Sequence, residues 1–454
     1  MNHRFSPHPQ PLSQAWERFA LVGKPDGLAN QERGEPEPDA RAGCEGRMRS
    51  VRVRANHTLI QQRQNLHHVV HIRLMKLGIV CDYYEEGWVS MDICTQMLHD
   101  GLLKIDPDTY LSQIRPKFHW RFNHINSVIG KQQSFNADRF INRYWEYPRY
   151  LRSHQQDYDL FHVADHSYAH LVHSLPADRT GVFCHDIDAF KSIVEPDTYT
   201  GSRSYREIAK RILSGMQKAA IVFHSTSAVR QQLERYQLID PARLVSAPYG
   251  VSPEYRLEPI LDDPIAAELK YQLQGRPYLM HVGSCIPRKR IDVLLDIFAQ
   301  LRDRLPELLL VKVGGEWSQS QRQQIVDLHF GEHIFHLTKV SNQTVAALYQ
   351  QAAIVMITSE AEGFGLPVIE ALTCGAIAIA SDIPPLREVG GAAVIYCPVG
   401  DISTWVVQTH NAISIANFAP ILESRLRQAA LYSWEKHAQS VFQAYSVLNS
   451  RKSK

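Results

Sequence analysis

The stretch that decides the fold spans residues 358–375 and reads TSEAEGFGLPVIEALTCG. Ala352–Thr358, which leads into it, is apolar and rich in β-branched residues, as is typical of a buried strand. The apolar residues that follow the turn are spaced for one face of a helix: Val368, Ile369 and Leu372. Pro367 suits the first turn of a helix, and Gly375 stands where a helix would end. The stretch therefore predicts a strand, a glycine turn and the start of a helix.

This turn has the features of a phosphate-binding site. A helix start offers unpaired N–H donors and partial positive charge, while Gly363 and Gly365 let the backbone approach a ligand closely. Glu362 and Glu370 flank the turn, and ionised carboxylates are strong acceptors for hydroxyl groups. Glu362 could reach a sugar beyond the phosphates, and Glu370 could hold a ribose, so the pattern indicates a nucleotide sugar. The alternative is an ordinary strand–helix turn with two solvated glutamates.

A family resemblance supports the first interpretation. EGFGLPVIEAL (362–372), followed by GAIAIASDIPPLREVGG (375–391), is similar to the Glu-x7-Glu signature of family-4 retaining glycosyltransferases. The resemblance covers residues 277–400 and extends more weakly back to about residue 75. It implies an α/β fold with GT-B architecture, in which two Rossmann-like parallel-sheet domains face each other across a cleft. It also implies that Glu362 contacts the transferred sugar and Glu370 the ribose, with Gly363, Phe364, Gly365 and Leu366 binding the donor between them.

The chain is long enough for two domains with separate cores. We expect an acceptor-binding domain at 75–255, a donor-binding domain at 256–430 and a C-terminal helix at 431–454 that crosses back to the first domain. Residues 1–74 are rich in Pro, Gln, Arg and Glu without apolar periodicity. This composition predicts a disordered or mis-assigned N-terminal extension, with Met75 as the suspected true start.

Composition narrows the class of protein. Basic and acidic residues nearly balance, at 49 and 47, so no global field favours nucleic acid. The seven cysteines are scattered without a C-x-x-C pair, which indicates reduced thiols rather than disulfides or a zinc site. No apolar run is long enough to span a membrane, and no signal peptide is evident. We therefore expect a cytoplasmic protein, which could act at the inner face of the membrane.

Five apolar segments separated by helical patterns predict a parallel sheet in the first domain: Lys76–Cys81, Leu160–Asp165, Thr180–Cys184, Ala219–His224 and Arg243–Ala247. Ligands of such sheets bind at the carboxyl ends of the strands. His185 follows one strand, in the pattern of a family histidine that approaches the transferred sugar, and His166 is a candidate acceptor contact. By resemblance, Gly87 and Trp88 line the acceptor side, although Trp88 could simply cover the core.

Asp186-Ile187-Asp188 forms a D-x-D sequence, which in the GT-A glycosyltransferase fold holds a divalent metal. Because positive charge is available elsewhere in this chain, we interpret this D-x-D as incidental and expect no metal and no other cofactor. The basic and aromatic segment 111–152 allows three interpretations: a lipid headgroup surface, a solvated helix pair with buried rings, or stacking on nucleic acid. The helix pair is favoured because no clean two-faced helix is present.

Six further strands interleaved with helices predict a complete Rossmann-like sheet in the second domain: Tyr278–Gly283, Leu308–Gly314, His333–Leu337, Ala353–Thr358, Ala376–Ser381 and Ala392–Tyr396. Arg288, Lys289 and Arg290 follow the first of these strands and open the helix Ile291–Leu301. Such cations can neutralise a leaving diphosphate without a metal.

The family places an Arg and a Lys in this region. Lys289 fits the lysine position, whereas the usual arginine just after the strand's glycine is Ser284 here, so Arg288 is its candidate substitute. Lys339 and Val340, which follow the next strand but one, are expected to meet the base.

Together these features predict a metal-independent retaining hexosyltransferase. It would move a hexose from a UDP- or GDP-linked sugar to a glycan or lipid-linked acceptor, in surface polysaccharide or glycoconjugate synthesis. Its predicted catalytic residues are Glu362, His185, Lys289 and Arg288. Two alternatives remain open: a sugar-nucleotide epimerase or hydrolase of the same fold, and an inactive sugar-nucleotide-binding subunit.

Overall fold

The computed structural model describes residues 75–125, 130–197 and 202–450. The extension predicted for residues 1–74 and Cys44 within it lie outside the described residues. The other six cysteines are free thiols. No helix in the described part of the chain is long and apolar enough to cross a membrane.

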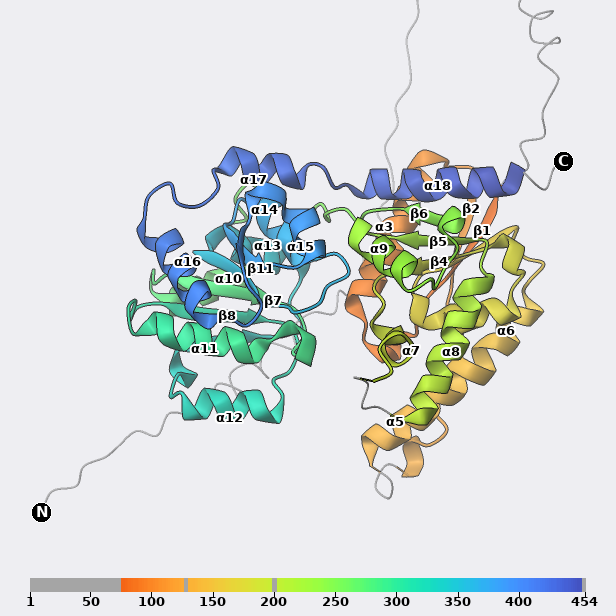
Figure 1. The fold of residues 1–454 in the computed structure, drawn as a ribbon, viewed down its shortest axis with the longest axis horizontal. Helices are drawn as coiled ribbons and strands as arrows, with labels where there is room; N and C mark the ends of the chain where they lie inside the picture. The colour runs from red at the N-terminus through yellow and green to blue at the C-terminus, as the bar shows by residue number, and fades with distance from the viewer. Residues whose placement is uncertain (1–74, 126–129, 198–201, 451–454) are drawn as a thin grey trace, which may run out of the picture. The chain divides into compact units, whose positions relative to one another are not determined.

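The first sheet has six parallel strands in the order β2-β1-β3-β4-β5-β6 (Figure 1). They are β1 (Lys76–Val80), β2 (Tyr110–Ile114), β3 (Leu160–Val163), β4 (Thr180–Cys184), β5 (Ile221–His224) and β6 (Leu244–Ser246). Five of these were predicted from the sequence. The exception, β2, lies at the edge of the sheet and pairs with β1 from Lys76↔Tyr110 to Val80↔Ile114.

Along the chain, α-helices connect most of these strands. They are α3 (Val89–Ile105), α5 (Lys131–Ile141), α6 (Tyr147–Ser153), α7 (Lys191–Val194), α8 (Arg203–Lys218) and α9 (Ser227–Arg235). A π-helical turn, Asn142–Glu146, joins α5 to α6. Within the basic and aromatic segment, Phe118 and Tyr147 are buried, as the favoured interpretation expected, but the rings of Trp120, Phe140 and Trp145 are exposed.

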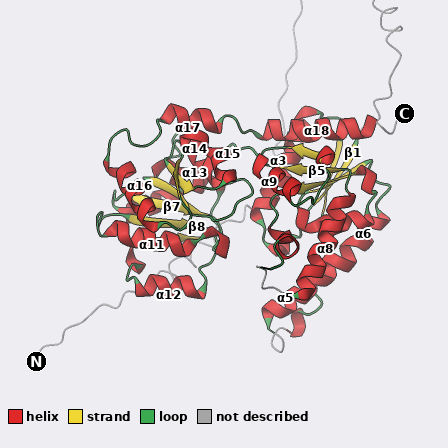
Figure 2. Ribbon diagram, viewed as in Figure 1, coloured by secondary structure: helices red, strands yellow, loops and turns green. Residues whose placement is uncertain are grey.

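The second sheet also has six parallel strands, in the order β12-β11-β10-β7-β8-β9. They are β7 (Tyr278–Val282), β8 (Leu309–Val313), β9 (Ile334–Leu337), β10 (Ile354–Ile357), β11 (Ala378–Ser381) and β12 (Ile395–Cys397), all predicted. Its helices are α10 (Pro264–Leu273), α11 (Ile291–Arg302), α12 (Gln319–Asp327), α13 (Asn342–Gln351), α14 (Leu366–Thr373), α15 (Pro384–Gly390), α16 (Ile402–Ser414) and α17 (Leu422–Ala429). Figure 2 shows both sheets with helices around them.

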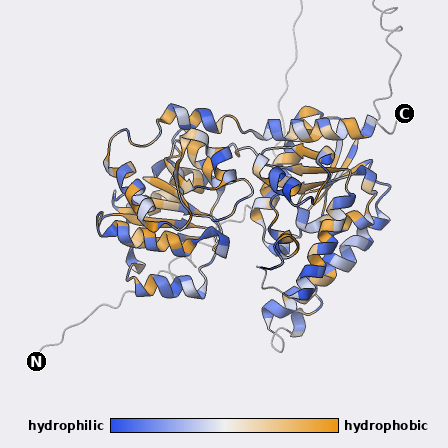
Figure 3. Cartoon of the chain, in the orientation of Figure 1, coloured by the Kyte–Doolittle hydropathy of each residue, from blue (hydrophilic) through white to orange (hydrophobic). Residues whose placement is uncertain are grey.

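Apolar strands form the centre of each sheet, as the hydropathy colouring in Figure 3 shows. Val80, Phe161 and Val182 belong to a core cluster of the first sheet, and Leu279, Leu310 and Met356 to a cluster of the second. Burial of this apolar surface is the main stabilising contribution to both units. The α/β fold class with two parallel sheets is therefore confirmed.

The last helix, α18 (Trp434–Ser450), packs against α3 and β6 of the first sheet. Ser433 caps it, because the Lys436 N–H donates to Ser433 Oγ at 3.2 Å. Inside the first sheet, the Tyr445 hydroxyl donates to the Phe161 carbonyl at 3.0 Å. The chain thus returns to the first sheet after completing the second.

Candidate active site

The order of the second sheet reverses between β7 and β10, which are neighbours in the sheet although β8 and β9 lie between them in the chain. In open α/β sheets, ligands bind outside the carboxyl ends of the strands at such a switch point. The segments that leave β7 and β10 here are 283–290 and 358–365. These segments hold four of the eight residues predicted to bind the donor, together with the predicted catalytic residues Arg288, Lys289 and Glu362.

Glu362 is the centre of a charged cluster in these segments. Its Oε1 accepts from Lys289 Nζ at 2.5 Å and from Ser359 Oγ at 2.7 Å. Its Oε2 accepts from Arg288 Nη1 at 3.1 Å, and only 7% of its side chain is exposed. The three predicted catalytic residues of this domain are therefore in direct contact.

Two opposing effects act on the pKa of Glu362. Burial disfavours the charged carboxylate, but the nearby Lys289 and Arg288 and the hydrogen bonds of the cluster outweigh it, so the pKa lies below its ordinary value. Glu362 is thus an ionised, oriented carboxylate beside two cations.

The sequence suggested that all three cations open the helix, but only Arg290 stands at its start, as the N-cap residue. Arg288 and Lys289 lie in a separate 3-10 turn, Pro287–Lys289, and α11 begins only at Ile291. Arg290 adopts a left-handed conformation with φ of 47° and pairs with Asp292 at 2.9 Å. Arg288 and Lys289 in the 3-10 turn therefore contact Glu362, whereas Arg290 pairs with Asp292.

Gly363 is required for contact with the first sheet. A Cβ at this position would lie 1.9 Å from the carbonyl oxygen of His185, and the Thr226 hydroxyl donates to the Gly363 carbonyl at 2.9 Å. The predicted close approach is thus made by the protein's own backbone. Gly365 has φ of 97° and precedes α14, whose Pro367 lies in the first turn as predicted.

Phe364 lies within an aromatic cluster. It is buried, with its ring centroid 5.2 Å from that of Tyr249 and 5.4 Å from that of Tyr432. These contacts give Phe364 a packing role that fixes the turn between Glu362 and α14. Leu366 is half-buried at the start of that helix.

His185 follows β4, and both nitrogens of its ring have partners. Nδ1 bonds the Tyr249 hydroxyl and Nε2 lies 2.8 Å from the Ala164 carbonyl. Burial lowers its pKa, against the opposing charge of Asp165. The neutral ring is therefore held firmly, and the His185 backbone carbonyl is the part that meets Gly363.

Glu370 lies in α14 in a different environment from Glu362. The Tyr349 hydroxyl donates to its Oε2 at 3.2 Å, and Tyr255 is a second hydroxyl donor. Burial raises the pKa of Glu370 to about 7, because no cation offsets the loss of hydration. The pKa values of the two glutamates of the motif are thus shifted in opposite directions.

The other predicted donor residues occupy strand ends of the same sheet. Ser284 is half-buried after β7, while Lys339 and Val340 follow β9, with Lys339 exposed and at φ of 55°. Among the predicted acceptor residues, Gly87 and Trp88 precede α3 and are exposed. The Trp88 indole N–H donates to Glu86 at 3.3 Å, so this ring does not cover the core.

His166 lies at the switch point of the first sheet, between β1 and β3, and is buried. Its Nδ1 lies 3.3 Å from Asp165 and also accepts from the His185 backbone N–H. Asp82, which follows β1, is buried with no hydrogen-bond donor to its carboxyl oxygens among the described residues. Burial and the neighbouring Asp165 raise its pKa well above the usual range.

Sequence reasoning missed several of these polar residues. Asp82 has a signal, since a carboxylate directly after an apolar strand is unusual. The ion pairs of buried Glu86 with Arg139 (2.9 Å) and Arg143 (3.3 Å) join positions far apart in sequence and have no signal. Lys312, a lysine within the apolar run of β8, is a third missed residue.

The D-x-D aspartates already have side-chain partners, which for Asp188 are cations. Asp188 lies 3.0 Å from Lys191 and 3.4 Å from Arg288, and Asp186 lies 3.7 Å from His166. Across residues 75–125, 130–197 and 202–450, no group of three His, Cys, Asp or Glu side chains could hold a metal ion.

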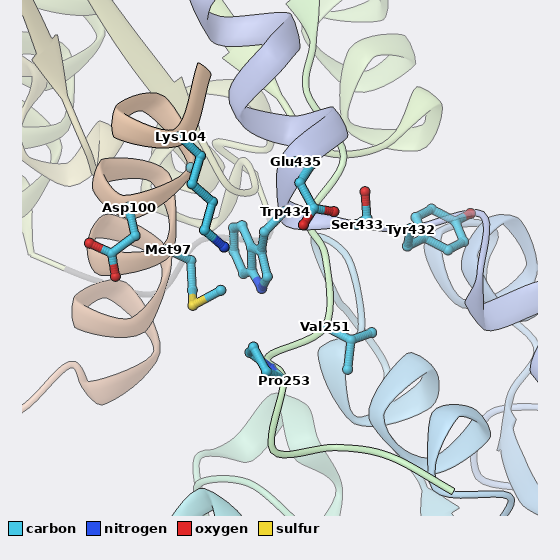
Figure 4. Close-up of a pocket in the computed structure, with 10 residues that line it drawn as sticks. Met97, Asp100, Lys104, Val251, Pro253, Tyr432, Ser433, Trp434 and Glu435 are labelled. Carbon is cyan, nitrogen blue, oxygen red and sulfur yellow. The ribbon is translucent and has the colours of Figure 1, made fainter. Parts of the chain in front are cut away.

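A small cavity of about 100 Å³ lies beside α3 and the start of α18 (Figure 4). Met97, Lys104, Pro253 and Trp434 are among the residues that line it, and the buried Trp434 indole N–H has no partner in the described structure. No residue predicted for the donor or acceptor site lines this cavity.

Part of the chain that contains the Lys289–Glu362 cluster is similar to a known family. Residues 269–418 match the family model described as glycosyl transferases group 1. The Lys289–Glu362 cluster and Glu370 all lie within these residues.

Curated relatives extend this similarity beyond these residues. The chain is 27% identical over 316 residues to O-antigen chain mannosyltransferase B of Escherichia coli, covering 66% of this chain and 79% of that protein. It is 26% identical over 298 residues to the serotype-specific mannosyltransferase WbdA of Escherichia coli. That match covers 62% of this chain but only 36% of WbdA.

Solved structures share the whole described fold. HepE of Anabaena, solved with UDP and glucose, has a TM-score of 0.61 at 15% identity, covering 82% of this chain and 100% of HepE. WaaG, a glycosyltransferase involved in lipopolysaccharide biosynthesis, has a TM-score of 0.58 at 15% identity, covering 82% and 99%. With the two six-stranded sheets, these similarities confirm the GT-B architecture.

Proposed function

We propose that this protein is a metal-independent, retaining hexosyltransferase that uses a UDP- or GDP-linked sugar in the synthesis of a surface polysaccharide or glycoconjugate. One observation carries the proposal: Lys289, Arg288 and Glu362 form a contiguous cluster at the switch point of the second sheet, among residues that match the glycosyl transferases group 1 family model. The names of the relatives favour mannose as the hexose. An O-antigen-like glycan or a lipid-linked sugar is the proposed acceptor.

The chemistry proposed for the cluster follows from its charges. As the bond between the sugar C1 and the phosphate oxygen breaks, negative charge develops on the leaving diphosphate. Lys289 and Arg288, already oriented, stabilise this charge without a metal. Glu362 faces the positive charge that develops on the sugar, and Glu370 holds the ribose through its hydroxyl groups.

For retention, the acceptor oxygen bonds to C1 on the face that the phosphate leaves. The acceptor's proton passes to an oxygen of the departing phosphate, so no enzyme carboxylate needs to act as the nucleophile. The first sheet presents the acceptor, with His185 and His166 at the carboxyl ends of its strands and Gly87 and Trp88 before α3. In this proposal the domain of residues 75–255 binds the acceptor and that of 256–430 the donor.

A lipid surface is part of the proposal for the acceptor. Phe140 and Trp145 are exposed on adjoining turns and, with Ile141 and Tyr144, line a shallow hollow of about 380 Å³. Exposed aromatic rings with nearby basic residues suit the headgroup layer of a membrane. Sedimentation with anionic vesicles tests this proposal, and Trp145→Ser should reduce binding if the rings insert.

Incubation with GDP-mannose and a panel of UDP-sugars, with and without a lipid-linked glycan acceptor, tests the function. The proposal predicts that one donor is consumed rapidly only when the acceptor is present, with unchanged anomeric configuration in the product by NMR. Donor turnover without acceptor would favour the epimerase or hydrolase alternative. Donor binding without turnover would favour the inactive binding subunit.

A further inference from the structure

Lys312 is a buried cation in the middle of the second sheet. It lies on β8 and is 0% exposed. It forms no ion pair with a carboxylate in the described part of the chain. The lost hydration of a buried ammonium must be replaced by hydrogen bonds, and here backbone carbonyl oxygens accept them.

Those carbonyls belong to the turns that leave two neighbouring strands. Lys312 Nζ donates to the carbonyl of Gly283, after β7, at 2.7 Å. It also donates to the carbonyls of Val313, at 3.0 Å, and Gly314, both at the end of β8. One side chain therefore ties the 283–284 turn to the 313–315 turn.

The two turns are also packed backbone to backbone. A Cβ on Gly315, whose φ is 59°, would lie 2.6 Å from the Cys285 nitrogen and 2.7 Å from the Ser284 Cα. A Cβ on Gly283 would lie 3.9 Å from Lys289 Cε, so the first turn adjoins the charged cluster. Lys312 thus acts on a structure that reaches the proposed donor site.

The direction of each carbonyl that accepts a hydrogen bond from Lys312 fixes the direction of the N–H group in the same peptide bond. In a trans peptide, the C=O and the following N–H point in opposite directions. Because the Gly283 and Gly314 carbonyls point at Lys312, the Ser284 and Gly315 N–H groups point away from it. Neither N–H donates a hydrogen bond to another described residue.

We propose that Lys312 is a positioning residue of the donor site, which holds these two turns so that the Ser284 and Gly315 N–H groups bind an oxygen of the nucleoside diphosphate. This inference rests on the proposed function. The alternative is that Lys312 only closes the end of the sheet and contributes to stability alone.

Three proteins separate positioning from stability: the wild type, Lys312→Met and the control Val311→Ala. Val311 is a buried neighbour on the same strand, and its truncation destabilises the sheet by a cavity while leaving the three carbonyl contacts intact. GDP and UDP are titrated calorimetrically into each protein at a temperature at which melting curves show all three folded. Lys312→Arg tests whether a second cation restores binding.

The wild type should bind one of the two nucleotides. Lys312→Met should weaken that binding by about tenfold or more, as expected for lost hydrogen bonds to a charged ligand, and Lys312→Arg should restore part of it. Val311→Ala should bind within twofold of the wild type. A Lys312→Met affinity within twofold of the wild type would overturn the positioning role while leaving the proposed function intact.

Amide-resolved hydrogen exchange of the wild type provides a test that does not depend on any variant folding. The nucleotide should slow exchange at Ser284 and Gly315, while the amides of β12, at the opposite edge of the sheet from β8 and β9, serve as the reference. Unchanged exchange at both amides in a wild type that binds nucleotide would overturn the inference. A wild type that binds neither GDP nor UDP would overturn the proposed donor site together with the inference.

Discussion

Lys289 Nζ lies 2.5 Å from Oε1 of Glu362, in a cluster that Arg288 completes from the other carboxylate oxygen. The two residues come from the loops after β7 and β10, neighbouring strands at the switch point. Their charges balance each other before any donor is present. If a diphosphate binds here as proposed, it must redistribute the contacts of Lys289 and Arg288, which would leave Glu362 available to the sugar.

Replacing Glu362 with Gln should lower kcat by roughly 100-fold or more, the scale of losing one preorganised electrostatic contact. Nucleoside diphosphate binding should stay near normal or tighten, because Lys289 and Arg288 lose a competing anion. Steady-state kinetics with the consumed donor measures kcat. Glu360→Gln is the matched control, since Glu360 is an exposed neighbour that pairs with Arg290 at 3.5 Å. A normal kcat in Glu362→Gln would remove this residue from the catalytic set.

Stability should depend on pH through Glu370. Its pKa of about 7 in the fold lies above the ordinary 4.5, so the folded protein binds this proton more tightly than the unfolded chain. The resulting stabilisation is complete below about pH 4.5 and is lost as the pH rises through 7. Glu370→Gln has no such proton to lose. The melting temperature of the variant relative to the wild type should therefore increase between pH 5 and pH 8.

The expected size of this change is on the order of 1 kcal/mol or more, which corresponds to a few degrees. Differential scanning fluorimetry at matched ionic strength measures it, with Glu362→Gln as the control. Glu362 has the opposite shift, with a pKa below its ordinary value, and so loses its contribution only at acid pH. A pH-independent difference for Glu370→Gln would show that this carboxyl ionises normally in the fold.

Donor turnover should survive chelation by EDTA, because Lys289 and Arg288 supply the positive charge that a metal would otherwise provide. Asp188, the second aspartate of the D-x-D sequence, already has Lys191 and Arg288 as cationic neighbours. Turnover is measured after dialysis against EDTA and again after addition of Mn²⁺ or Mg²⁺. Activity that disappears in EDTA and returns with metal would make Asp186 and Asp188 ligands instead.

Sequence patterns predicted most of the fold because central parallel strands are continuous apolar runs. Strand β10, which reads IVMI and is fully buried, is the clearest case in the second sheet. The strand, turn and helix around Gly363–Pro367 were predicted from the same apolar run and the residues that follow it. Edge strand β2 reads YLSQI, and only Ile114 within it is buried. An edge strand needs little apolar content, so its place was visible only from its pairing with β1.

The site was predictable where residues are close in sequence and less so where they meet through the fold. Glu362 and Glu370 could be found from their spacing, and Lys289 from its place after a strand. The contact between Gly363 and His185 joins the two sheets and has no local signal. The apolar residues around Lys312 indicated only a buried strand. Burying a lysine is energetically unfavourable without compensating hydrogen bonds, so its presence in such a strand could have indicated a specific role.

The central claim is that Glu362 and Glu370 serve the two ends of one nucleotide sugar. Calorimetric titration of the nucleoside diphosphate into the wild type, Glu362→Gln and Glu370→Gln tests it most directly. A carboxylate that holds the ribose contributes similarly to the ground and transition states, so Glu370→Gln should weaken nucleotide binding and raise the donor KM. Glu362→Gln should bind the nucleotide almost as the wild type does. Equal losses of nucleotide affinity in both variants, or no loss in either, would contradict this account.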